Sequence, residues 1–136
     1  MNYSLLADLI VAFHLVYVVC VISGLFAVLL GGALRLRFVR NFWFRAIHLA
    51  MILVVVVEAL SGISCPLTEL EYDLRIAAGQ HDAANVSFVA RLIHRIIFYD
   101  FPPVVFTAAY CLFGALVLVS WFLVPPVFPW RKKKKR

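Results

Sequence analysis

Twenty-one consecutive residues near the C-terminus, Val104 to Val124, contain no charged side chain. About 20 apolar residues in a helix cross the hydrocarbon core of a bilayer, so this run has the length of one membrane span. Prolines stand on both sides of it, at 102 and 103 and at 125 and 126, and proline cannot continue a helix. The run therefore predicts a membrane-spanning helix with defined ends.

Two further apolar runs, Leu5 to Leu34 and Ala46 to Ser64, predict two more spans. The composition agrees, because 65% of the residues are hydrophobic and 15% are charged, whereas globular proteins have roughly half and a quarter. We expect an all-α membrane protein with three transmembrane helices. Residues 1–130 should form a single integral membrane domain, and residues 131–136 a basic cytoplasmic tail.

The positions of the basic residues predict the orientation of the spans. Ten of the 13 lie in two groups that a three-span topology places on one side, namely Arg35, Arg37, Arg40, Arg45 and residues 131–136. By the positive-inside rule that side is cytoplasmic. The N-terminus and residues 65–101 then face the opposite side, which is the periplasm if the membrane is a bacterial inner membrane.

The basic tail, RKKKKR, stands a few residues after the last predicted span. Next to a bilayer, such a run fixes topology and attracts anionic lipid headgroups. We therefore expect lipid partners for the tail and no nucleic acid.

The outer segment contains two predicted helices. In CPLTELEYDLR, Thr68 stands three residues before Glu71, the spacing of a capping box, and Arg75 stands four residues after Glu71, where the two can pair. Downstream, Phe88, Leu92 and Ile96 recur at helical spacing opposite polar side chains. This pattern predicts an outer amphipathic helix, which together with the three spans would make a four-helix bundle.

Three ionisable residues are the candidate functional positions. Glu58 interrupts the second apolar run and His14 the first, and an ionisable group inside a span is a functional candidate because burying it in lipid is costly. We predict that Glu58 and His14 face each other in a polar pocket, with His94 and Asp100 near its mouth. A haem of type b, a quinone or a metal could use His14, Glu58 and His94. In the structural alternative, Glu58 bonds to His14 or Tyr17 and fixes helix register.

Two other residues have simpler interpretations. His48 stands close to Arg45 near the basic side, and we interpret it as an interfacial histidine. Cys65 is interpreted either as a buried small side chain or as a reactive thiol facing an oxidising compartment.

Several stretches resemble the bacterial domain of unknown function 2784 family of small membrane proteins. They are FH at residues 13–14, HL at 48–49, the run from Glu58 through GISCPLTELEYDLR, SFVARLIH, and YDFP. The resemblance covers nearly the whole chain, and CPLT-x-LE-x-x-LR is its most specific part. The family has no established activity, so the resemblance implies only positions: His14, His48, Glu58, Cys65, Pro66, Thr68, Glu71, Arg75 and His94.

These observations leave two functions open. The sequence contains no nucleophile-base-orienter triad, phosphate loop or CxxC motif. We expect a small accessory subunit that packs onto a larger membrane complex, of which redox and photosynthetic complexes are examples. The alternative is a cofactor-binding membrane protein that uses the pocket of His14, Glu58 and His94.

Overall fold

The computed structural model describes residues 2–80, 88–97 and 101–129. In chain order these form α1 (Tyr3–Ala33), the short 3-10 helix η1 (Phe38–Arg40), α2 (Phe42–Ser61), α3 (Pro66–Ala77), α4 (Phe88–Ile97) and α5 (Pro103–Leu123). Of these, α1, α2 and α5 are long and apolar enough to cross a membrane. The all-α membrane architecture is confirmed, and α3 and α4 occupy the segments for which short helices were predicted.

The ends of α2 differ from the sequence prediction. The helix begins at Phe42, four residues before the predicted start, because the Asn41 side chain accepts a hydrogen bond of 3.0 Å from the Trp43 amide and caps the helix. It ends at Ser61 because Gly62, with φ of 66°, adopts the left-handed conformation that closes many helices. Pro66 does not close α2 and instead stands at the start of α3.

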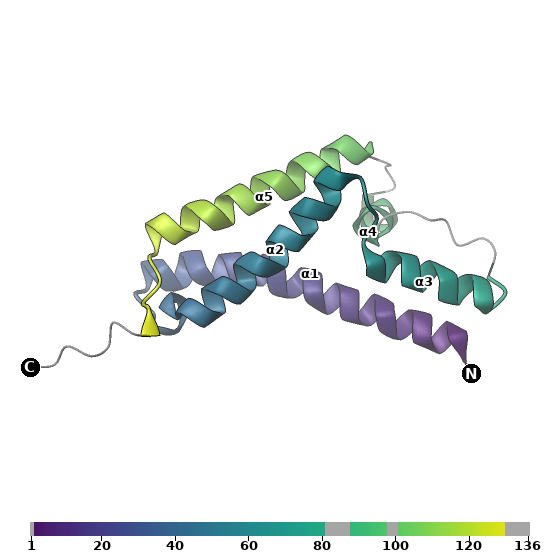
Figure 1. Ribbon diagram of the computed structural model, residues 1–136, viewed down its shortest axis with the longest axis horizontal. Coiled ribbons are helices and arrows are strands. Elements are labelled where there is room, and N and C mark those ends of the chain that lie inside the picture. The colour runs from purple at the N-terminus through teal and green to yellow at the C-terminus, as the bar shows by residue number, and fades with distance from the viewer. Residues whose placement is uncertain (1, 81–87, 98–100, 130–136) are drawn as a thin grey trace, which may run out of the picture.

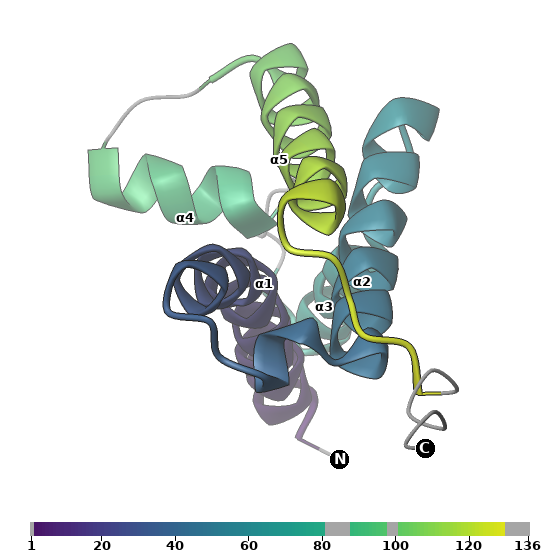
Figure 2. The ribbon, with the colours of Figure 1, turned by 90° about the vertical axis from the view of Figure 1, so that its left-hand side faces the viewer.

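The helices pack as two pairs (Figure 1). α3 folds back along the first half of α1, and α5 lies along α2, whereas α1 and α2 meet over a shorter stretch. The N-terminus and α3 lie at one end, which we call the acidic end. The opposite end, with η1, the start of α2 and residues 124–129, we call the basic end (Figures 1 and 2).

The first helix is longer than a membrane is thick. With 31 residues, α1 extends about 46 Å at ~1.5 Å per residue. The hydrocarbon core measures only roughly 30 Å. Because α3 covers α1 at its N-terminal half, this half can continue past the bilayer as part of a folded cap.

The apolar core lies where α1, α2 and α5 cross. Val21, Leu25, Ile52 and Val117 are buried together there. Gly24 is also buried, and its lack of a side chain admits the His48 ring, since a Cβ at this position would lie 2.4 Å from His48 Cδ2. His48 Nε2 stands 2.7 Å from the Val21 carbonyl oxygen and must carry a proton to donate to it. The face of α1 that contains Val21 and Gly24 is therefore a helix-packing face.

The basic end is closed by contacts between segments far apart in the sequence. The Val127 amide donates a hydrogen bond of 2.6 Å to the Arg40 carbonyl, and Arg40 Nε donates one of 3.2 Å to the Pro125 carbonyl. Val39 is completely buried against Gly31, where a Cβ would come within 2.5 Å of a Val39 methyl group. These contacts attach the segment that follows α5 to the connection between α1 and α2.

Replacing Gly24 with alanine should destabilise the protein by about 1 to 3 kcal/mol, because the added methyl group overlaps the His48 ring. Thermal unfolding in detergent measures the effect. Cys20→Ala on the exposed side of α1 is the matched control and should change little. Shortening the opposing side chain in a Gly24→Ala/His48→Ala double variant should make the two effects less than additive, and strict additivity would contradict the contact.

Candidate functional site

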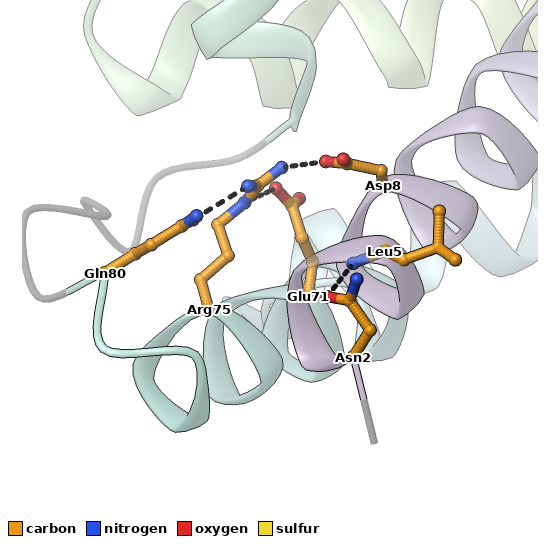
Figure 3. Close-up of polar contacts among 6 residues, drawn as sticks. All are labelled: Asn2, Leu5, Asp8, Glu71, Arg75 and Gln80. Carbon is orange, nitrogen blue, oxygen red and sulfur yellow. Dashed lines mark hydrogen bonds and ion pairs between the residues drawn. The ribbon is translucent and has the colours of Figure 1, made fainter.

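Arg75 of α3 contacts three polar side chains at the acidic end (Figure 3). Its Nε donates to Glu71 Oε1 at 2.8 Å, its Nη1 to Gln80 Oε1 at 3.1 Å and its Nη2 to Asp8 Oδ1 of α1 at 3.2 Å. The predicted pair between Glu71 and Arg75 is thus present. The hydrogen bond that Arg75 donates to the Glu71 carboxylate is the main reason that the pKa of Arg75 lies above its usual value. The contact between Arg75 and Asp8 joins α3 to α1.

The buried face of α3 consists of polar side chains. Thr68 and Glu71 are 4% and 2% exposed, and Ala7 of the adjoining α1 is completely buried. The small size of Ala7 allows the two helices to approach closely. A helix that buries a carboxylate in this way requires a cation beside it, since an unpaired buried charge is strongly unfavourable. Arg75 supplies that cation.

The predicted capping box is wrong. α3 begins at Pro66, with Cys65 as its N-cap residue and no side-chain capping bond, so Thr68 stands inside the first turn. Proline favours the first helical position because its backbone angle is already helical and it has no amide hydrogen to leave unpaired. The start of α3 is therefore set three residues earlier than the threonine spacing suggested.

Glu58 lies next to Cys65 and Tyr17. Cys65 is half-buried, and burial raises the pKa of its thiol, with a further increase from the neighbouring Glu58 carboxylate. Tyr17 is within electrostatic range of Glu58 and Cys65, and its hydroxyl donates a hydrogen bond of 2.7 Å to the Met51 carbonyl. Helices α1 and α2 and the start of α3 thus meet at one polar cluster, Tyr17, Glu58 and Cys65.

The other two predicted pocket residues lie on separate helices. His14 is half-buried on α1, and His94 is exposed on α4. Within residues 2–80, 88–97 and 101–129, no group of three or more His, Cys, Asp or Glu side chains could hold a metal ion. Asp100, which was expected at the mouth of the pocket, lies outside the described residues.

Two residues at the basic end differ from their predicted roles. His48 is 5% exposed and contacts α1, so it is not an interfacial side chain. Arg45 was assigned to the cytoplasmic connection but is 1% exposed inside α2. Its Nη1 donates to the Val124 carbonyl at 3.0 Å and its Nη2 to Ser120 Oγ at 3.1 Å, and its guanidinium stands 5.5 Å from the centre of the Trp121 ring. Both residues lie deeper than expected because α2 starts earlier.

Sequence reasoning missed the contact between Asp8 and Arg75, although a signal for it existed. Asp8 is the only acid in the first apolar run, and Arg75 is the only cation in the motif of α3. The predicted topology places both at the same end of the molecule. Opposite charges that are isolated among apolar residues at the same depth are candidates for pairing.

A family model described as "Protein of Unknown function (DUF2784)" matches residues 4–126. The matched range contains α2, α3, α4, α5 and all of α1 except its first residue, and it includes Asp8, Glu58, Cys65, Glu71 and Arg75. Comparisons with curated proteins and with solved structures find no match.

Replacing Arg75 with glutamine should destabilise the protein more than replacing Asp8 with asparagine. The Glu71 side chain is 3% exposed and loses a charged hydrogen bond in Arg75→Gln, which costs about 1.5 to 3 kcal/mol. The Asp8 side chain is 63% exposed, so Asp8→Asn should cost about 0.2 to 1 kcal/mol. Unfolding of both variants in the same detergent gives the comparison, and equal losses would show that Glu71 does not depend on Arg75.

The pH dependence of the alkylation of Cys65 should reveal its interaction with Glu58. In a Cys20→Ala/Cys111→Ala background, the alkylation rate of the folded protein should rise at higher pH than in the unfolded chain, where a thiol has a pKa of about 8.5. Because the folded pKa is the higher one, the thiol favours the folded state below the unfolded pKa, and this contribution is lost as the pH rises through the folded value. Glu58→Gln should move the rate profile to lower pH. An unchanged profile would mean that the two groups do not interact.

Proposed function

Since the chain belongs to the DUF2784 family, which is described only as proteins of unknown function, we propose its function from its own contacts: it is an accessory subunit that packs onto a larger complex in the bacterial inner membrane. Candidate classes for this larger complex are redox and photosynthetic complexes. The observation that carries the proposal is the use of the buried polar groups of the spans. Tyr17, His48 and Arg45 each bond to a neighbouring helix or to its end. The hydrogen bonds of these three side chains hold the helices of this chain together.

The outer surface of the spans supports the same proposal. Only 17% of the most apolar part of each span is buried within the chain. At the acidic end, α3 exposes Glu69 and Asp73 beside Leu70, which is 45% exposed. A surface with charge around an apolar centre resembles the polar rim and apolar core of protein interfaces.

The proposed orientation places the N-terminus and residues 65–101 in the periplasm and residues 35–40 and the C-terminus in the cytoplasm. Nine of the 13 basic residues, namely Arg35, Arg37, Arg40 and residues 131–136, support it without the buried Arg45. In cysteine-free protein, Gln80→Cys should be labelled by an impermeant maleimide from the periplasmic side, and Arg37→Cys only after the membrane is opened. Labelling of Gln80→Cys from the cytoplasmic side alone would reverse the orientation.

Site-specific photo-crosslinking tests the accessory role. A photoreactive amino acid placed at Leu70 on α3, or at Phe122 on α5, which is 86% exposed, samples two candidate surfaces. The buried Ile52 is the matched control position. We expect one exposed position to crosslink to a defined partner protein. The same partner should co-purify in stoichiometric amount with the chain that carries no photoreactive residue. A protein that purifies alone, with adducts to lipid only, would contradict the proposal.

The second candidate function is cofactor binding by His14, Glu58 and His94. The observation that favours it is the half-buried carboxyl of Glu58 near the end of a membrane helix, beside Tyr17 and Cys65. An absorption spectrum of the detergent-purified protein discriminates between the two functions. A Soret band that is lost in His14→Ala, or a quinone that is extracted from the protein and lost in Glu58→Gln, would support cofactor binding. Neither is expected of an accessory subunit.

A further inference from the structure

The exposed arginines of the basic end have no acidic partner in their part of the chain. Arg35, Arg37 and Arg40 are exposed in residues 34–40, which we call the arginine loop. Between Asp8 and Glu58 the sequence contains no acid, and none follows Asp100. The acids that the structure describes lie towards the other end, in the first turns of α1, the last turn of α2 and α3. The described acids therefore do not neutralise the arginine loop, which leaves it open to an anion from outside the chain.

Apolar side chains alternate with these arginines. Leu34, Leu36 and Phe38 are 71%, 43% and 57% exposed, and Trp43 at the start of α2 is 62% exposed. Exposed aromatic and aliphatic groups next to arginines suit the boundary between hydrocarbon and headgroups, where one side of a residue is apolar and the other is charged. We propose that the arginine loop is a docking surface for the headgroups of anionic phospholipids.

The backbone of Arg35 provides an independent observation. Its φ is 56°, in the left-handed region that is costly for residues other than glycine. The amides of Arg35 and Leu36 close α1 by bonding to the carbonyls of Gly32 at 3.1 Å and Gly31 at 2.7 Å. Glycine is the usual residue at this position of such a helix end. Backbone strain of this kind makes Arg35 a candidate for a functional role of its side chain.

The end of the described chain lies beside the same loop. The Val127 amide bonds to the Arg40 carbonyl, and Val127 pairs with Asn41 as an isolated parallel bridge. The basic residues 131–136 begin only four residues later, outside the described residues. The arginine loop and the end of the described chain thus lie together at one end of the molecule, and the proposed surface consists of the loop.

Native mass spectrometry of the detergent-purified full chain tests this assignment. Phosphatidylglycerol and phosphatidylcholine with identical acyl chains are the two probes. We expect a preference for phosphatidylglycerol that falls with added salt. It should fall about fivefold in Arg37→Gln and about fivefold in Arg35→Gly, the ratio that corresponds to about 1 kcal/mol per arginine near an anionic surface.

The choice of substitutions separates lipid binding from folding. Arg35→Gly relieves the strained backbone, so its melting temperature should be equal to or higher than that of the wild type although its lipid preference falls. Arg35→Lys keeps the charge and should keep the preference. Arg95→Gln, which removes an exposed cation of α4, is the control and should leave the preference unchanged.

Three results would overturn the proposal. One is equal binding of the two lipids by the wild type. Another is an unchanged preference in an Arg35→Gly/Arg37→Gln double variant together with its loss when the four lysines at 132–135 are replaced with glutamine, because this would assign binding to the tail alone. The third is that the wild type shows no lipid preference while the loop variants lose a protein partner. This result would assign the surface to an acidic protein. Since the measurement uses the purified chain alone, its outcome does not depend on the proposed complex.

Discussion

The interior of a lipid bilayer offers no hydrogen-bond partners, so a polar group within a span is costly unless it finds one in the protein. In this chain that requirement determines how the helices meet. The Tyr17 hydroxyl and the His48 ring connect α1 and α2 through backbone carbonyls, and Arg45 connects α2 to the end of α5. Glycine at position 24 permits the closest of these approaches, since any larger side chain would occupy the space of the His48 ring.

The same requirement explains the division of the molecule into two helix pairs. α1 is too long for the bilayer, and α3 covers its N-terminal half, where the buried Glu71 carboxylate is balanced by Arg75. At the opposite end, the contacts of Arg40 and Val127 join the segment after α5 to the connection between α1 and α2. Charges of opposite sign therefore dominate the two ends. This separation of charge underlies both the proposed orientation and the proposed lipid surface.

Much of the fold could be predicted from the sequence, because the lengths of apolar runs and the positions of prolines follow from the thickness of the bilayer. The ends of α2 could not be predicted as well, because the cap formed by Asn41 and the left-handed Gly62 are local and compete with other signals. Arg45 was assigned to a loop for this reason. The contact between Asp8 and Arg75 joins residues 67 positions apart, and pairing at such a separation depends on how α3 packs.

The central claim is that polar side chains inside the spans hold the helices together, and the bond between Arg45 and Ser120 tests it most directly. The measurement is a double-mutant cycle of Arg45→Met and Ser120→Ala, with the free energy of unfolding determined in detergent for all four proteins. The account predicts a coupling energy of about 0.5 to 3 kcal/mol, because each side chain loses its partner when the other is replaced. Additive effects, with no coupling beyond the error of the measurement, would contradict it.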